Sequence, residues 1–142
     1  MNLNSGAKNA KGAVSNIHWG GSDDESETQS GAYGSARDVA KLFTYALNSA
    51  QELYAETATS SVTIMSLSGR RVHATNTDLV LDSLPGIIIG KTGYTDLAGG
   101  NLALIFEANG RRYAAVVLGS TEEGRFSDIQ QLTATTRSIF LQ

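Results

Sequence analysis

The sequence predicts an α+β fold, with an antiparallel sheet covered by helices. The pair Asn109-Gly110 joins two apolar segments, and Asn-Gly is a strong signal for the tight turn of an antiparallel hairpin. Segments with helical spacing of apolar residues stand before and after the strand-like segments. Because an apolar sheet face must be covered, the helices are expected to pack on the sheet. The chain of 142 residues is interpreted as a single domain, with a loop-rich start over 1–34 and the regular elements over 35–142.

The composition excludes several kinds of function. A hydrophobic fraction of 41% is typical of a globular protein, and a net charge of -3 gives no reason to expect nucleic acid as a partner. The absence of cysteine excludes disulfides, zinc-thiolate sites and a thiol nucleophile, and we expect no metal and no cofactor. The first six residues lack the basic start and apolar stretch of a signal peptide, so none is expected in this chain.

The first elements can be placed from local signals. We expect a short helical start and a long loop before residue 34, with a solvated acidic run over 23–27. The clearest helix begins at Ser35, which forms a capping box with Asp38. Its core-facing stripe consists of Val39, Leu42, Phe43, Ala46 and Leu47. A second, weaker helical turn is expected over 51–54.

The remaining elements have the composition of strands and a closing helix. Residues 61–67 predict a strand that turns at Ser68-Gly69 into a partner around 71–73. A linker over 75–84 leads to a buried, β-branched strand over 86–90. Two further strands are expected over 101–107 and 112–119, and a closing helix over 122–142.

The segment that carries chemistry is Lys91-Thr92-Gly93, directly after the buried strand. Alone, this tripeptide is a weak signal, but Gly90 precedes it, Tyr94-Thr95 follows it, and Ala98-Gly99 stands before the next strand. This arrangement resembles the Gly-x-Lys-Thr-Gly-x-Thr…Ala-Gly-x-x-Leu pattern of the serine D-Ala-D-Ala carboxypeptidases among the low-molecular-mass penicillin-binding proteins. The resemblance implies that the Lys-Thr-Gly segment is itself a substrate-binding strand, at the edge of the active-site cleft. Three further features are similar to that family. They are Met1-Asn2, which resembles the point where the family's domain resumes after its helical half, the helix start at Ser35, and the pair Thr75-Asn76 before an apolar run.

The resemblance implies a fold and a set of roles. The chain would be the sheet-bearing part of a β-lactamase/penicillin-binding-protein-like fold, and therefore a partial transpeptidase-like domain. Lys91 and Thr92 would bind a substrate carboxylate, Gly93 would let the ligand approach the backbone, and the Tyr94 N–H would be an oxyanion donor. The partners would be a peptidoglycan stem peptide ending in D-Ala-D-Ala and, in the intact protein, β-lactams. The parent protein would act outside the cytoplasmic membrane, in the periplasm or at the cell surface.

The family also needs a Ser-x-x-Lys nucleophile motif and a Ser-x-Asn motif. We expect both to lie upstream of Met1, on a helical portion that this chain lacks, so that the sequence contains neither. No catalytic residue is therefore expected here, and the isolated chain is expected to be inactive. Two alternatives stay open: a β-lactamase-like relative, and a non-catalytic half-domain that binds peptide or self-associates through the surface left by the missing half.

Overall fold

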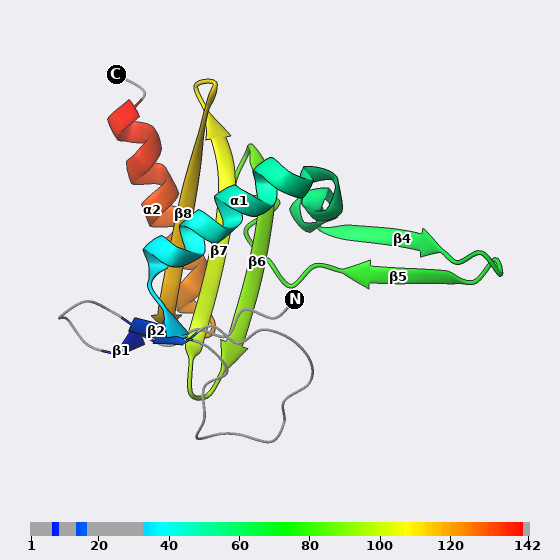
Figure 1. Ribbon diagram of the computed structural model, residues 1–142, viewed down its shortest axis with the longest axis horizontal. Coiled ribbons are helices and arrows are strands. Elements are labelled where there is room, and N and C mark those ends of the chain that lie inside the picture. The colour runs from blue at the N-terminus through cyan, green and yellow to red at the C-terminus, as the bar shows by residue number, and fades with distance from the viewer. Residues whose placement is uncertain (1–6, 9–13, 17–32, 141–142) are drawn as a thin grey trace.

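A computed structural model of the chain describes residues 7–8, 14–16 and 33–140. Its centre is an antiparallel sheet of three strands in the order β6-β7-β8 (Figure 1). The three strands are β6 (Ile87–Thr95), β7 (Gly99–Ala108) and β8 (Arg111–Ser120). The expected antiparallel sheet is therefore confirmed, and the tight turn after β7 joins it to β8 as the sequence predicts.

Two helices cover the two faces of this sheet. The helix α1 (Ala36–Tyr54) packs against a cluster that contains Ala103 and Ile105 of β7. The helix α2 (Gly124–Phe140) contributes Ile129 to a second cluster, which contains the alternate residues of the same strand. Because successive side chains of a strand point to opposite faces, the two clusters lie on opposite sides of the sheet. The sheet is thus covered on both faces, by one helix on each.

The middle strand, β7, explains why both helices are needed. Each of the five residues from Leu102 to Phe106 is at most 2% exposed. Burial of apolar surface stabilises a fold by about 25 cal/mol for each Å² removed from water, so an unbroken apolar strand favours cover on both sides. A ring stack from Phe106 through Tyr113 to Phe140 extends the cluster to the end of α2.

The predicted start of α1 is confirmed. Ser35 is the N-cap, its hydroxyl accepts from the Asp38 N–H, and the Asp38 carboxylate accepts from the Ser35 N–H. The Ser35 N–H and the Ser35 hydroxyl both donate to the Asp38 carboxylate, and these two hydrogen bonds lower the pKa of Asp38, since they favour its charged form. Ala50 has non-helical angles within α1, and the expected weaker turn is the part of α1 that follows this kink.

The turn between β7 and β8 has the geometry that its sequence predicts. Asn109 and Gly110 have φ angles of 51° and 68°, so both central residues are left-handed. This is the arrangement of a type I′ turn, whose twist matches that of the flanking strands. Asn109 also donates from its side-chain amide to the Phe140 carbonyl, which ties the turn to the end of α2.

A separate hairpin projects from the body of the molecule (Figure 1). It consists of β4 (Ser61–Met65) and β5 (Arg71–Thr75), joined by a turn in which Gly69 has a φ of 81°. Ile64 pairs with Val72 across the hairpin, and these two apolar side chains are 57% and 49% exposed. The hairpin therefore lacks an apolar partner among the described residues.

The described parts of the first 34 residues are short strands. β1 (Ala7–Lys8), β2 (Val14–Asn16) and β3 (Tyr33–Gly34) pair antiparallel. The acidic run over 23–27 and most of the expected helical start lie outside the described residues.

The structure also changes one predicted boundary. The strand expected over 86–90 continues to Thr95, because residues from Gly90 to Thr95 pair in register with β7. Ile88 is an extra residue, since Ile87 and Ile89 oppose the adjacent pair Phe106 and Ile105. Lys91-Thr92-Gly93 thus lies inside a strand, as the resemblance implies, although the local pattern ends the strand at Gly90.

Gly86 and Gly110 have similar positive φ angles but differ in how closely other atoms approach them. A Cβ on Gly86 (φ +79°) would lie 2.6 Å from the Glu107 carbonyl oxygen, whereas a Cβ on Gly110 (φ +68°) would meet nothing within 4 Å. We expect Gly110→Ala to lower the free energy of unfolding by about 1 kcal/mol, the cost of a left-handed alanine. Gly86→Ala adds a backbone clash and should cost about 3 kcal/mol. Urea unfolding of both variants measures the difference, and equal losses would contradict the packing described.

Candidate functional site

The candidate site is the edge of β6 opposite β7, where no strand of the described part of the chain pairs with it. The Gly90 N–H donates to the Thr57 hydroxyl at 3.1 Å, so it points away from β7. Since every second amide of a strand points to the same edge, those of Thr92 and Tyr94 share this direction. The short helix η1 (Ala55–Ala58), which contains Thr57, occupies the edge at Gly90. An extended ligand could therefore approach at Thr92 and Tyr94.

A turn before β6 supports η1 at this edge. The side-chain amide of Asn76 donates to the carbonyls of Thr57 and Thr59, each at 3.0 Å. The Asn76 side-chain oxygen accepts from the Asp78 N–H. The linker expected over 75–84 is therefore an ordered support for the strand.

Lys91 places a positive charge beside the free edge. It pairs with Ala103, which faces α1, and its Nζ donates to the Thr92 carbonyl at 2.6 Å. Burial lowers the pKa of Lys91 below its ordinary value, and Arg125 lowers it further, while Asp78 acts in the opposite direction. The ammonium thus lies at the edge, where it is held by a carbonyl that a bound ligand would also reach.

Thr92 points to the other face of the strand, toward α2. Its hydroxyl lies 2.5 Å from that of Thr77, and the residue is 5% exposed. Thr77, by contrast, lies at the surface. Either hydroxyl can be the donor in this hydrogen bond, so the Thr92 hydroxyl can accept from Thr77 and donate to a ligand carboxylate.

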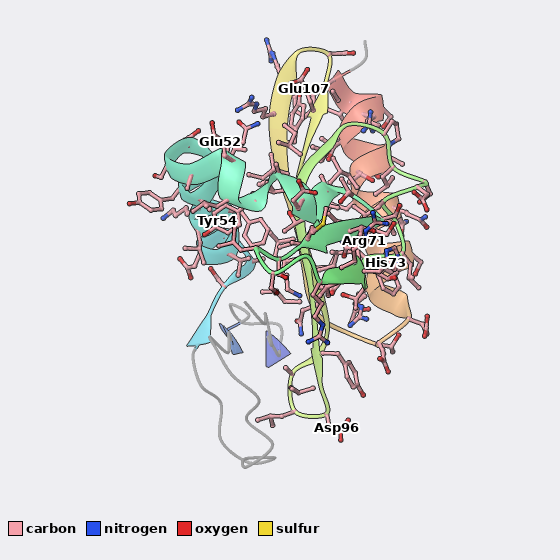
Figure 2. All side chains as sticks on the ribbon, turned by 90° about the vertical axis from the view of Figure 1, so that its right-hand side faces the viewer. Glu52, Tyr54, Arg71, His73, Asp96 and Glu107 are labelled. Atoms are coloured by element: carbon pink, nitrogen blue, oxygen red, sulfur yellow. The ribbon has the colours of Figure 1, made fainter. Side chains whose placement is uncertain are left out.

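Gly93 and Tyr94 are engaged in different ways. The Gly93 carbonyl accepts from the Arg125 guanidinium at 3.0 Å, in a buried position. The Tyr94 hydroxyl donates to Asp96, and this hydrogen bond raises the pKa of the phenol. Figure 2 shows Asp96 at the turn after β6, at the opposite end of the sheet from Glu107. The side chain of Tyr94 is therefore bound at the turn, and only its backbone faces the free edge.

Sequence reasoning missed two buried charged residues at this strand. Asp78 is 4% exposed and Arg125 is 7% exposed. The Asp78 carboxylate accepts from the Val80 N–H two residues later, a local pattern that aspartate often forms in turns and that the sequence could have suggested. Arg125 lies at the start of α2 and reaches β6 only in the folded chain, so no local signal identifies it.

One expectation about the motifs is wrong. Ser5 and Lys8 do have Ser-x-x-Lys spacing, although Ser-x-Asn occurs nowhere. Lys8 lies in the strand β1. Ser5 lies outside the described residues, so the structure describes no serine–lysine pair at this spacing.

Solved structures with the same fold define the class of protein. The Streptomyces K15 DD-transpeptidase superposes with a TM-score of 0.64 at 24% identity, over 75% of this chain and 42% of that one. Penicillin-Binding Protein D2 from Listeria monocytogenes in its ampicillin-bound form gives 0.67 at 26% identity, over 84% and 47%. The fold is thus that of the penicillin-binding proteins, and the chain spans less than half the length of these relatives.

The family follows from the sequence. A profile of the D-alanyl-D-alanine carboxypeptidase family matches residues 8–122, which is most of the chain. The chain belongs to this family. A comparison with curated protein sequences found no match.

The hydroxyl pair at β6 can be tested by two isosteric substitutions. Thr77→Val leaves the buried Thr92 hydroxyl without its partner, and we expect a loss of about 1–2 kcal/mol in the free energy of unfolding. Thr92→Val leaves only the surface hydroxyl of Thr77, which water can satisfy, so it should cost less. The double variant should be more stable than Thr77→Val alone, as measured by urea unfolding. Additive losses in the double variant would rule out the pairing.

Proposed function

We propose that this chain is the Lys-Thr-Gly part of a serine-type D-Ala-D-Ala carboxypeptidase that trims peptidoglycan stem peptides. The observation that carries the proposal is the free edge of β6, with the Lys91 ammonium beside it. Membership of the carboxypeptidase family supports the reaction class. The attacking serine would come from another part of the protein.

The substrate would add to β6 as a further antiparallel strand. An edge strand offers unpaired N–H and C=O groups, and an extended peptide can hydrogen-bond to them. Lys91 and the Thr92 hydroxyl would bind the terminal carboxylate of the peptide, as a charge and a donor. Gly93 carries no side chain, so the peptide could approach the backbone closely.

The Tyr94 N–H would contribute to catalysis as an oxyanion donor. When a serine attacks the carbonyl of the penultimate D-Ala, its oxygen becomes negative, and a backbone N–H aimed at it stabilises this charge. The terminal D-Ala then leaves and water hydrolyses the acyl-enzyme. The direction of the Gly90 N–H supports this role. Every second N–H of a strand points to the same edge, so the N–H of Tyr94, four residues after Gly90, also points to the free edge.

β-Lactams would be a second class of ligand. Penicillin-Binding Protein D2 is described in cefotaxime-bound and ampicillin-bound forms, and it shares this fold. A β-lactam carboxylate would meet Lys91 in the same way as the peptide carboxylate. A β-lactamase-like relative remains the alternative reaction, and turnover of a chromogenic β-lactam by the full protein distinguishes the two.

The substrate also suggests where the protein acts. Peptidoglycan lies outside the cytoplasmic membrane, so we place the parent protein in the periplasm or at the cell surface. Neither α1 nor α2 nor any other described helix is long and apolar enough to span a membrane.

Peptide binding by the chain itself provides the main test. Titration of purified chain with diacetyl-Lys-D-Ala-D-Ala should shift the amide resonances of Thr92 and Tyr94 in NMR spectra. Lys91→Ala should weaken the interaction by about tenfold or more, because it removes the charged partner of the carboxylate. Lys41→Ala, an exposed lysine on α1, is the matched control and should leave it unchanged.

The same samples test catalysis. We expect no release of D-Ala, since the chain is proposed to lack the attacking serine. Release of D-Ala would contradict that expectation. Amide resonance shifts confined to residues outside β6 would contradict the proposed role of this strand.

Self-association is the second candidate, and the projecting hairpin favours it. Leu67 at its tip is fully exposed, and Ile64 and Met65 are more than half exposed. An exposed apolar surface of this kind often marks an interface. Sedimentation should then show a concentration-dependent dimer that Ile64→Lys weakens, while a monomer at all concentrations would exclude it.

A further inference from the structure

The short helix η1 closes one end of the free edge of β6. The Thr57 hydroxyl accepts from the Gly90 N–H at 3.1 Å and donates to the Tyr54 carbonyl at 2.6 Å. These two hydrogen bonds hold the hydroxyl in one orientation. The backbone donor of Gly90 is therefore already satisfied within the chain, and a ligand strand can use it only by displacing Thr57.

The side chain of Asn76 holds η1 against the strand. Its amide donates to the carbonyls of Thr57 and Thr59, each at 3.0 Å. Gly90 is buried, whereas Tyr94, four residues further along β6, is exposed. The edge is thus closed at Gly90 by a supported helix and open toward Tyr94.

An antiparallel ligand would run toward the closed end. Its carboxyl end points to the amino end of β6, which is the end nearer Gly90. The ligand residue whose carbonyl accepts from the Tyr94 N–H opposes Tyr94, and each following residue opposes the preceding residue of β6. The fourth residue after the reacting carbonyl would therefore oppose Gly90, where the Thr57 hydroxyl lies. A chain that ends after one residue has its carboxylate close to Thr92 and stops short of η1.

We propose that η1 makes the site specific for the end of a peptide, because Thr57, held in place by Asn76, excludes a chain that continues as far as Gly90. The inference rests on the proposed function, since it takes the reacting carbonyl to lie at the Tyr94 N–H. Thr57 and Asn76 do not touch the terminal D-Ala. They close the edge beyond it, so that the site accepts a free carboxyl terminus and rejects the interior of a longer chain.

Loss of the carboxylate contact alone makes a different prediction. An extended peptide has no carboxylate beside Lys91 and Thr92, so it would bind weakly even if η1 were not an obstruction. The C-terminal amide of diacetyl-Lys-D-Ala-D-Ala lacks the same charge but is no longer than the parent peptide. Exclusion by η1 predicts that the extended peptide binds more weakly than this amide, whereas the charge alone predicts equal binding.

The experiment is an NMR titration of the purified chain with three ligands. They are diacetyl-Lys-D-Ala-D-Ala, its C-terminal amide, and the same peptide extended by three glycines, whose last residue would oppose Gly90. The extended peptide should bind about tenfold more weakly than the amide, which corresponds to the loss of one hydrogen bond at the edge. No measurable difference between these two ligands would overturn the proposal.

Variants of η1 provide the second comparison. The double variant Thr57→Ala/Asn76→Ala should bind the extended peptide about tenfold more tightly than the unmodified chain does, and the Gly90 amide resonance should then shift on binding. Its affinity for diacetyl-Lys-D-Ala-D-Ala should be unchanged. Thr59→Ala is the matched control, because the Thr59 hydroxyl donates to the Glu56 carbonyl, and it should change neither affinity.

The outcomes separate this inference from the proposed function. If diacetyl-Lys-D-Ala-D-Ala does not bind to the unmodified chain, the proposed function fails at its first step. If it binds, and the double variant does not gain affinity for the extended peptide, the proposed function stands and the role of η1 is overturned. If the double variant does not fold, the comparison of the extended peptide with the amide on the unmodified chain decides.

Discussion

The pairing of β6 with β7 is the constraint on which the rest of the structure depends. β7 is buried on both faces and hydrogen-bonded on both sides, so it is the most firmly fixed strand of the sheet. β6 takes its register from this neighbour, and that register decides which residues face each way. Lys91 opposes Ala103 and therefore lies on the α1 side, whereas Thr92 opposes Leu102 and lies on the α2 side. A shift by one residue would exchange these two faces.

The same pairing leaves one edge of β6 open, and the chain covers only part of it. The Thr57 hydroxyl accepts from the Gly90 N–H, and the Asn76 side chain donates to the carbonyls of Thr57 and Thr59. The edge of β6 at Gly90 is therefore covered by η1. An uncovered edge is a hazard for aggregation, which proteins commonly limit with short exposed stretches and charges. Here the stretch that remains open carries the Lys91 ammonium. The charge that protects the edge is also the charge proposed to select an anionic ligand.

Local signals explain which features the sequence could predict. The Ser35 capping box, the Asn109-Gly110 turn and the identity of Lys91 to Tyr94 each depend on a few adjacent residues, so they can be read from the chain. The extension of β6 to Thr95 is implied by the family resemblance and by no local signal, because a Gly-rich polar segment becomes a strand only by pairing with β7. Arg125 was missed for the same reason, since only a tertiary contact brings it to β6. Asp78 was missed although its hydrogen bond to the Val80 N–H is a local turn pattern.

Two glycines of β6, one on each side of Lys91-Thr92, lie against buried charged side chains. Gly90 has space for the Asp78 carboxylate against its backbone, and the Gly93 carbonyl accepts from Arg125. Asp78 and Arg125 thus place one negative and one positive group against β6, while Lys91 lies on the α1 side of the strand. A substrate carboxylate arriving at the edge would add a second negative charge and favour the protonated form of Lys91 still more. The strand would therefore bind an anion most strongly when Lys91 is charged.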